Sequence, residues 1–505
     1  MKDIPKEVLS VAKQLEGAGF EAYIVGGCVR DLLIGKEPQD WDVATNARPE
    51  EIQKIFPKSF YENKFFTVTV LTGSENPTLK EIEITTFRSD AEYADKRRPE
   101  KVEFAKTIEE DLSRRDFTIN AIALRPEAHS AKYKAHDNQK KDSVLYATRY
   151  TIFDPFGGQK DIKAKFIRAV GNPKERFAED ALRMMRGVRF YAQLGFEIEK
   201  ETKEAIAHHA NLLKEISQER IRDELSKIIK SDRVAEGIDM LRELGLLAYS
   251  ITELQEGWGV TQNKHHIYTV WEHNLKSVQY AAEKKFSFEV RLASLLHDIG
   301  KPRTKRGDGP DSTFYGHQVV GAKMARKILE RLKFPKETVD KITLLIREHM
   351  FVYDPETVTL RGVRRLVARV GVENIDDLFE VREADRIGSG VPKAQPYRLR
   401  HLKAMVEKVK TDPVSPKMLN INGNDVMEFL GIRPGPKVGA VLSVLLEEVL
   451  DDPSKNAKEL LVSRAKELGS LAEKDLIELA SKAKQSAEAA QQRIDEEIKG
   501  RYFVK

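Results

Sequence analysis

The sequence predicts a multidomain, mostly helical protein with a small α/β head at its N-terminal end. At 505 residues the chain exceeds one ordinary domain, so we expect three or four domains, each burying its own core. A hydrophobic content of 41% and a charged content of 33% are typical of a soluble, mainly helical protein. Strand-like alternation is confined to the first part of the chain, where we expect a mixed sheet of about five strands.

Charge, cysteine content and hydropathy show which classes of protein this sequence excludes. The 85 basic and 80 acidic residues give a net charge of +5, which neither requires nor excludes a nucleic-acid partner. Cys28 is the only cysteine, which excludes an intrachain disulfide framework and a thiolate zinc site and fits a reducing compartment. No apolar run approaches the roughly 18–20 residues of a membrane span, and the start MKDIPKEVLS lacks a signal-peptide core. We therefore expect a cytoplasmic protein without a membrane partner.

The stretch 23–45, YIVGGCVRDLLIGKEPQDWDVAT, carries the strongest chemical signal. Its apolar start, from Ala22 to Val25, reads as a strand that ends at Gly26 and Gly27. Backbone amides at such a turn can approach a phosphate because no side chain blocks them. A helix is expected next, over 29–34.

A pair of aspartates follows this helix. If 40–43 is a strand, its period of two places Asp40 and Asp42 on one face and Trp41 on the other. Magnesium prefers oxygen ligands and bridges them to substrate phosphates, so the pair suggests phosphoryl or nucleotidyl transfer with two metals. The alternative is a solvated turn with incidental acids.

These elements together resemble motif A of the polymerase-beta-type nucleotidyltransferases. More closely, GGCVRDLLIGKEPQDWDVAT is similar to the class II tRNA nucleotidyltransferases (CCA-adding enzymes) and to the related bacterial poly(A) polymerases. The resemblance implies that Asp40 and Asp42 hold two magnesium ions. It also implies that Gly26, Gly27 and Arg30 position nucleotide phosphates.

Further head motifs extend the resemblance. The strand KEIEITTF, 80–87, nominates Glu83 as a third catalytic carboxylate, against the alternative of an ordinary exposed strand residue. Residues 88–103 read as a charged mobile loop, which in the family helps the change from adding C to adding A. RRDFTINA resembles motif B, which implies that Asp116, beside Arg115, binds the ribose 2′-hydroxyl and favours NTP over dNTP.

Two segments close the head. Residues 126–150 are polar and lack a period, and we interpret them as an insertion relative to the family, without an assigned function. IFDPFGG then resembles motif C, in which Asp154, Gly157 and Gly158 would form the turn between head and neck.

The neck begins with a long helical pattern that runs from Pro173 to a stop at Gly195. On one helix Asp180 and Arg183 would be neighbours, and an ordinary i,i+3 ion pair is the structural alternative. RFAEDALRMMR resembles motif D, which implies that this Asp and Arg read the edge of the incoming base. Arg186 and Arg189 are also assigned to nucleotide binding.

A second neck helix is expected over 216–231, ISQERIRDELSKIIKS. Its polar positions include Arg220, Arg222 and Lys227, which are assigned to RNA phosphates with salt-sensitive affinity. A solvated helix face is the alternative.

Histidines and acids recur after the neck. Neutral imidazoles with carboxylates suit a divalent metal that activates water for phosphoester hydrolysis. Their order resembles the HD phosphohydrolase superfamily, which implies a divalent metal of unknown identity on His273, His297, Asp298 and Asp385. His317 and His349 match positions that bind a second metal in two-metal members.

The resemblance implies four domains, a polymerase-beta-type nucleotidyltransferase head (1–170), a helical neck (171–250), a helical HD domain (251–410) and a helical tail contacting the tRNA body (411–505). The expected activity is template-independent addition of C, C and A to tRNA 3′ ends from CTP and ATP. Alternatives are a poly(A) polymerase, a partial CC-adding or A-adding enzyme, an HD phosphohydrolase with an RNA-binding head, or a noncatalytic RNA chaperone. The sequence leaves the oligomeric state open.

Overall fold

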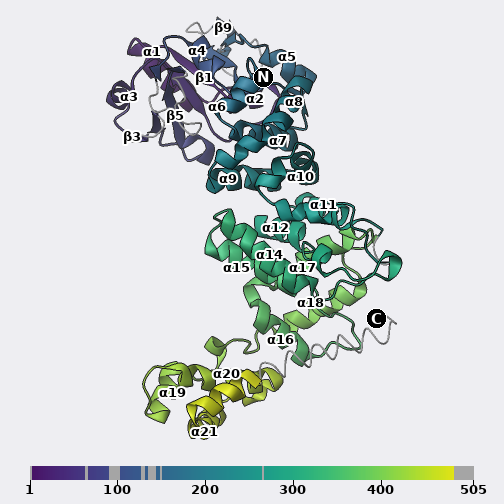
Figure 1. Ribbon diagram of the computed structural model, residues 1–505. Helices are drawn as coiled ribbons and strands as arrows, with labels where there is room; N and C mark the ends of the chain where they lie inside the picture. Colours follow the sequence, from purple (N-terminus) through teal and green to yellow (C-terminus); the bar gives the residue numbers. More distant parts are fainter. Residues whose placement is uncertain are drawn as a thin grey trace. The chain divides into compact units, whose positions relative to one another are not determined.

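A computed structural model describes residues 3–62, 66–89, 103–126, 131–134, 144–147, 150–263 and 267–482. The chain divides into two units, Met1–Thr252 and Glu253–Lys505 (Figure 1). Helices dominate both units, and the mixed sheet lies in the first, which confirms the predicted fold class. Within the described ranges, no helix is both long enough and apolar enough to cross a bilayer.

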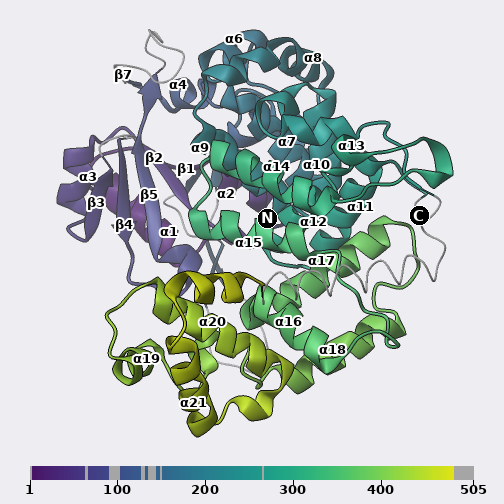
Figure 2. The same ribbon diagram turned by 60° about the horizontal axis from the view of Figure 1, so that its bottom comes forward.

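The sheet of the first unit has seven strands rather than the five expected. In spatial order they are β11 (Tyr150–Phe153), β8 (Ala123–Pro126), β1 (Ala22–Val25), β2 (Asp42–Thr45), β5 (Glu81–Thr86), β4 (Thr67–Leu71) and β3 (Ser59–Glu62) (Figure 2). Only β2 and β5 run parallel. The additional strands are four residues long, too short for a clear alternating pattern.

Helices cover one face of this sheet. The helices α1 (Lys6–Gly17), α2 (Gly27–Leu33) and α3 (Pro49–Ile55) share a core with alternate residues of the central strands. In α1 the buried residues Val8, Val11, Ala12 and Leu15 follow the helical period. On the opposite face α4 (Ile108–Ser113) shares a second core with β1 and with Ala44 of β2. The part formed by β5, β4 and β3 lies outside that second core.

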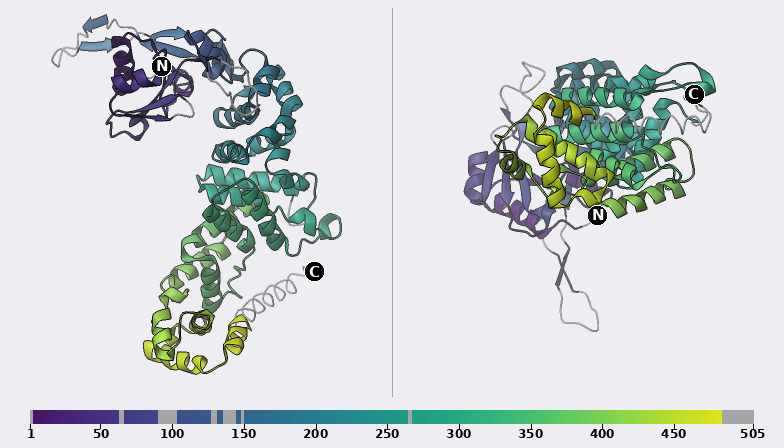
Figure 3. Two further views of the ribbon diagram at one scale, coloured as in Figure 1. Left: turned by 60° about the vertical axis from the view of Figure 1, so that its left-hand side comes forward. Right: turned by 90° about the horizontal axis from the view of Figure 1, so that it is seen from below.

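Two predicted loops fall mostly outside the described residues. They are the charged loop 88–103 and the insertion 126–150. Within them the structure describes two short ribbons, β6 (Arg88–Ser89) with β7 (Glu103–Phe104), and β9 (Ala131–Lys134) with β10 (Val144–Ala147) (Figure 3).

The neck is helical, but the long helix expected from Pro173 is interrupted. It forms α6 (Pro173–Glu179) and α7 (Leu182–Leu194), because Asp180 adopts an extended backbone with φ −142° and ψ 102°. Gly195 ends α7 with φ 70°, as predicted. The remaining elements are α5 (Gly158–Ala164), β12 (Phe166–Ile167), β13 (Glu197–Ile198), α8 (Lys200–His209), α9 (Gln218–Ile229) and α10 (Val234–Glu243).

The second unit is helical throughout its described part. Its first helices are α11 (Val270–Glu283), α12 (Phe288–Leu296), α13 (Lys301–Thr304), α14 (His317–Arg331), α15 (Lys336–Glu348), α16 (Leu360–Val370), α17 (Ile375–Gly388) and α18 (Tyr397–Val409). The chain then forms α19 (Gly423–Leu430), α20 (Pro436–Asp451) and α21 (Lys458–Gly469) around a separate apolar core. α11 packs against both α12 and α17, which brings together the helices that carry the predicted metal ligands.

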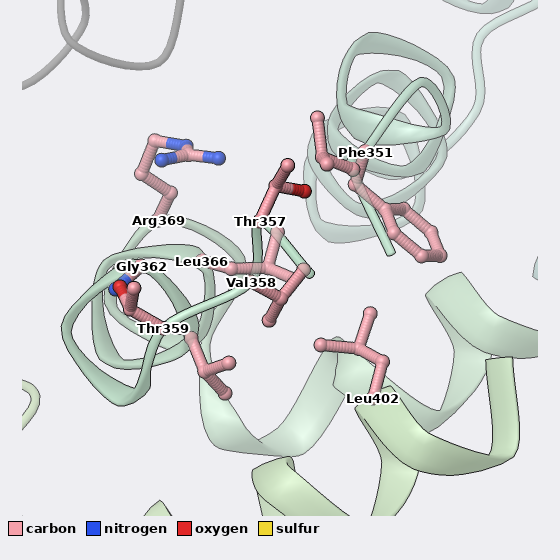
Figure 4. Close-up of a pocket in the computed structure, with 10 residues that line it drawn as sticks. Phe351, Thr357, Val358, Thr359, Gly362, Leu366, Arg369 and Leu402 are labelled. Carbon is pink, nitrogen blue, oxygen red and sulfur yellow. The ribbon is translucent and has the colours of Figure 1, made fainter. Parts of the chain in front are cut away.

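A small pocket lies between the segment after α15 and the helices α16 and α18. Phe351, Val358 and Leu402 line it together with the hydroxyl-bearing Thr357 (Figure 4). None of the predicted metal ligands lines this pocket. It is therefore distinct from the histidine cluster.

Candidate active site and histidine centre

The glycine turn lies directly against two charged side chains. Gly26 follows β1 with φ 82° and ψ −140° and caps α2. A β-carbon there would lie 3.0 Å from Arg115 Nη1 and 3.2 Å from Asp42 Oδ2. Glycine is required both by the positive φ and by this close approach. The turn thus brings backbone close to a carboxylate and a guanidinium.

The three predicted carboxylates gather at this turn, with one correction to the sequence prediction. Strand β2 begins at Asp42, so Asp40 lies in the bend before it rather than in the strand, and its side chain is exposed. Trp41 is 3% exposed and packs in the core beneath the sheet. Glu83 on β5 is the register partner of Asp42, so these two carboxylates occupy adjacent positions on parallel strands.

The electrostatics of the cluster suit a divalent cation. Burial, together with the negative charges of Glu83 and Asp40, raises the pKa of Asp42 to about 7, while Arg115 opposes the shift. Arg115 is itself engaged with Asp111, 3.0 Å from its Oδ2. A cation bound by these oxygens would offset the repulsion among the carboxylates, and the donor set is one that magnesium accepts. The residues present therefore fit the expected metal.

Asp116 is buried and firmly partnered. Its Oδ2 accepts a hydrogen bond from Arg186 Nε at 2.6 Å, and its Oδ1 accepts from the Phe117 amide and from Asn120 Nδ2. Burial opposes ionisation, but the Arg186 charge and these hydrogen bonds lower the pKa of Asp116 to about 2. The carboxylate is thus ionised at neutral pH, as acceptance from a ribose hydroxyl requires. Its assignment to that role stays a prediction.

Arginines from the head and the neck surround Phe190 on α7. The guanidinium carbons of Arg30, Arg186 and Arg189 lie 5.2, 5.6 and 4.4 Å from the ring centroid. Arg30 also donates to Asn120 Oδ1 at 2.7 Å. The three guanidinium groups therefore gather around one ring, and each also pairs with a carboxylate, of Asp31, Asp116 or Glu224 respectively. Their assignment to the nucleotide stays a prediction.

Arg189 is also held by a carboxylate of the neck. Its Nη1 lies 2.9 Å from Glu224 Oε2 in a buried ion pair. Burial and the neighbouring charge of Arg186 lower the pKa of Arg189 to about 10. This contact gives Arg189 a structural role within unit 1 in addition to the predicted one.

Asp180 and Arg183 do not form the i,i+3 pair of a continuous helix. Because the helix breaks at Asp180, its carboxylate accepts from the Leu182 amide at 3.1 Å and from Arg220 Nη2 at 2.8 Å. Arg183 donates instead to Glu179 Oε2 at 2.6 Å and to the Arg114 carbonyl at 2.9 Å. Since the next residue is Arg115, this contact ties the predicted base-reading segment to the strand end that carries Asp42.

The residues assigned to RNA on α9 all have carboxylate partners. Arg220 binds Asp180, Arg222 lies 2.8 Å from Asp223, and Lys227 lies 3.2 Å from Glu224. The Arg220 and Lys227 side chains remain 42% and 50% exposed, so they can still meet a phosphate. Their assignment to RNA stays a prediction.

In unit 2 the predicted histidines converge in two pairs. The Nε2 atoms of His273 and His297 lie 2.9 Å apart, and those of His317 and His349 lie 3.3 Å apart. Asp298 lies between the pairs, with Oδ2 3.1 Å from His273 Nε2 and Oδ1 3.3 Å from His317 Nε2. All five side chains are buried.

Asp385 on α17 completes the arrangement. Its Oδ1 lies 3.4 Å from His273 Nε2 and 3.6 Å from His297 Nε2. Its other oxygen is held by Arg382 on the same helix. Burial raises the pKa of Asp385, but the Arg382 charge and the histidines lower it overall, well below the ordinary value. It therefore remains an ionised donor.

The orientation of the imidazoles tests whether this set fits a metal. The Nδ1 atoms of His297, His317 and His349 lie 2.7–2.8 Å from backbone carbonyl oxygens. A carbonyl only accepts, so each Nδ1 carries the proton and each Nε2 presents a lone pair to the centre. Burial and the charges of the neighbouring histidines lower the pKa of His349 to about 3, which keeps it neutral. The donor set fits one or two divalent metals that share Asp298.

Several site residues escaped the sequence prediction. Asn120 links Arg30 to Asp116, and Lys301 Nζ lies 2.6 Å from Asp298 Oδ2. Glu179 holds Arg183. Asn120 and Lys301 lie in the motifs RRDFTINA and LLHDIGK, but the sequence does not show which side chains they contact. Only their neighbours in the fold reveal these positioning contacts.

Comparison with known proteins agrees with this architecture. Residues 22–168 match the family described as Poly A polymerase head domain, 195–257 match the probable RNA and SrmB-binding site of polymerase A, and 270–388 match the HD domain. The chain is 33% identical to a CCA-adding enzyme of Geobacillus thermodenitrificans, over 91% of this chain and 96% of that protein. A CCA-adding enzyme of Ligilactobacillus salivarius is also 33% identical, with coverages of 92% and 96%.

A solved structure gives the same picture. The chain superposes on the Bacillus stearothermophilus CCA-adding enzyme in complex with CTP with a TM-score of 0.65 and 31% identity, covering 92% of this chain and 98% of that one. The head fold and its family match define the class, a nucleotidyltransferase. Within that class, the chain belongs to the family of CCA-adding enzymes. The division into four domains at 170, 250 and 410 stays a prediction.

Proposed function

We propose that this chain adds C, C and A to the 3′ end of tRNA, using CTP and ATP and releasing pyrophosphate. One observation carries the proposal: Asp42, Glu83 and Asp40 gather beside the Gly26 turn, where Arg115 also lies. A carboxylate cluster next to a glycine turn is the arrangement that nucleotidyl transfer needs, since the same site meets both metal and phosphate.

In the head, the carboxylates would bind metal and the glycine turn would bind phosphate. Bound magnesium would lower the pKa of the primer 3′-hydroxyl and neutralise charge on the triphosphate. Asp40, Asp42 and Glu83 would supply its oxygen ligands. The backbone amides at Gly26 and Gly27 would contact phosphate oxygens, and the Arg30 guanidinium, which also pairs with Asp31, would bind the triphosphate.

Selection of the base and sugar falls to the neck and the adjoining head segment. Asp180 accepts and Arg183 donates hydrogen bonds, so together they can match the mixed edges of C and A without a template. Each of the two side chains has its own partner, Arg220 for Asp180 and Glu179 for Arg183. Asp116, ionised and backed by Arg186, would accept from the ribose 2′-hydroxyl.

An extension assay tests the proposal. tRNAs ending before CC, after CC and after CCA are incubated with each NTP separately. We expect C incorporation on the first, a single A on the second and none on the third. A long A tail would identify a poly(A) polymerase, and arrest after CC or failure to add C would identify a partial enzyme. The variant Asp40→Ala, Asp42→Ala must lose incorporation.

A second candidate function belongs to unit 2. We propose that the histidine centre hydrolyses a phosphoester, such as a 2′,3′-cyclic phosphate, with a divalent metal of unknown identity. The convergence of four Nε2 atoms on Asp298 favours it over a purely structural cluster. Metal analysis and cyclic-phosphate hydrolysis by the wild type and His297→Ala test the idea. Hydrolysis that survives His297→Ala would refute it.

A further inference from the structure

The face of the sheet that carries Glu83 continues past the carboxylates to the edge of the sheet. Val68, Val70, Ile82 and Ile84 of β4 and β5 pack into the core on one face. Because strand residues alternate, Thr69 and Glu83 point to the opposite face. Thr67 and Thr85 share that face, and their hydroxyl oxygens lie 3.4 Å apart.

A single cross-strand row connects the carboxylates with the edge strand. Asp42 is the register partner of Glu83, Glu83 of Thr69, and Thr69 of Phe60 on β3. Strands β5, β4 and β3 lie side by side in this order (Figure 2). Neighbouring strands are about 4.8 Å apart, which places Phe60 roughly 10 Å from Glu83.

Phe60 presents its ring on the same face as Glu83. The next residue, Tyr61, packs against the core below the sheet, so Phe60 points the other way. Its side chain is 44% exposed, whereas Thr69 between it and Glu83 is only 5% exposed. The accessible surface of the row therefore consists of a carboxylate at one end and an aromatic ring at the other.

We propose that Phe60 stacks on a base of the RNA substrate within its last few nucleotides, upstream of the reacting terminus. The inference rests on the proposed function, which places the 3′-hydroxyl at Asp42 and Glu83. Stacked nucleotides rise by about 3.4 Å, so a strand leaving that point spans roughly 10 Å in about three nucleotides. An exposed ring at that distance meets a base irrespective of its identity, because every base offers a π-face.

This contact serves an enzyme whose substrate end changes at each step. A hydrogen-bonding contact would select one base, whereas an aromatic platform accepts each base that the growing end presents. The occupant is the single-stranded 3′ end of RNA, and not the incoming nucleotide, for which the neck residues are positioned.

The test compares two substitutions at Phe60 with a matched control. Phe60→Val removes the ring and keeps a β-branched residue suited to a strand, and Phe60→Trp keeps an aromatic face. Phe166→Val removes a ring of similar exposure, 38% against 44% for Phe60, on β12 of the same unit. The measurements are KM for a tRNA that lacks its CCA end, KM for CTP, and CTP binding without RNA.

We expect Phe60→Val to raise KM for the tRNA about tenfold, the loss typical of one stacked base. Phe60→Trp should stay within about twofold of the wild type, and Phe166→Val should match it. CTP binding without RNA should not change. An unaltered KM for tRNA in Phe60→Val, or an equal loss in Phe166→Val, would overturn the proposal.

Two further outcomes assign Phe60 to another occupant and likewise overturn the proposal. Weaker CTP binding in Phe60→Val would place the incoming nucleotide on the ring. A change in oligomeric state on size-exclusion chromatography would make the edge strand β3 a contact between copies of the chain.

A binding experiment separates this inference from the proposed function. A fluorescently labelled single-stranded RNA is titrated with wild-type protein and with Phe60→Val, without nucleotide. If the wild type incorporates no nucleotide, the proposed function fails, yet weaker RNA binding by Phe60→Val still supports stacking. If incorporation is normal and both proteins bind RNA equally, only the stacking fails.

Discussion

The carboxylate cluster of unit 1 and the histidine centre of unit 2 differ in donors, burial and support. In the first, Asp40 and Glu83 are exposed, and burial together with their negative charges raises the pKa of Asp42 to about 7. In the second, every donor is buried, and backbone carbonyls orient three of the imidazoles. The first site therefore offers partly exposed oxygen donors, whereas the second holds buried donors whose orientation the backbone sets.

The largest expected effect comes from removing one donor at each site in turn. Asp42→Asn should lower nucleotide incorporation by about a thousandfold or more, because a charge-stabilising ligand is lost. It should leave metal content and phosphoester hydrolysis in unit 2 unchanged. Asp298→Asn should lower metal content and phosphoester hydrolysis in unit 2 and leave nucleotide incorporation unchanged. Extension and hydrolysis assays on both variants measure this, and parallel losses in either variant would contradict two independent sites.

The pH dependence of magnesium binding tests the electrostatics of the carboxylate cluster. Because the pKa of Asp42 is about 7 without metal, magnesium must displace a proton at lower pH. Apparent affinity should rise by about tenfold per pH unit between pH 5 and pH 7, and level off above that. Magnesium titrations of incorporation at several pH values measure it. A flat profile would show that Asp42 is ionised throughout.

The same raised pKa has a consequence for folding. The folded-state pKa lies above the unfolded value, so the protonated carboxyl favours the folded form at low pH. Asp42 should therefore contribute stability below about pH 4 that is lost as pH rises through 7. Metal-free Asp42→Asn should lack this component, which denaturant unfolding of both proteins at pH 5 and pH 8 would reveal.

Asp116 offers a smaller effect within the first site. Asp116→Asn removes the charge that Arg186 binds and weakens acceptance from a ribose hydroxyl. Discrimination between CTP and dCTP should fall by roughly tenfold to a hundredfold, since a hydrogen bond to a charged group is worth about 1.5–3 kcal/mol. Competition between the two nucleotides measures the ratio. Unchanged discrimination would leave Asp116 with a structural role only.

The smallest effect is expected at Arg220. Arg220→Gln removes the 2.8 Å contact that holds Asp180. Since the Arg220 side chain is 42% exposed, we expect only a few-fold loss of discrimination between CTP and UTP. Lys214→Gln, which removes an exposed lysine of the same unit, is the control. Equal effects of both substitutions would point to nonspecific loss of charge.

The sequence predicted elements well where a period was strong and poorly where one residue broke it. The strand β5 lies within one residue of its predicted bounds at each end. The prediction of one continuous neck helix was wrong at Asp180, because the extended backbone of this residue separates α6 from α7. The apolar period continues across this break, because the helices before and after it bury the same face. The sequence pattern therefore does not reveal the break.

For the candidate active site, the sequence predicted which types of residue are present, but it did not predict which side chains they contact. Arg183 was expected beside Asp180 and instead binds Glu179 and a carbonyl of the head. Arg220, Arg222 and Lys227 were assigned to RNA phosphates, and the sequence did not show that each also lies in an ion pair. Partners of long charged side chains depend on distant segments, which local patterns do not encode.

By itself, the sequence determined the helical fold class, the family, and the donor types that make each site chemically possible. These follow from periodicity and from motifs a few residues long. Only the tertiary structure decided that Asp42, Glu83, Thr69 and Phe60 form one row, and that Asp298 lies between two histidine pairs. Strand register and helix packing set those distances, and both arise from contacts between segments far apart in the chain.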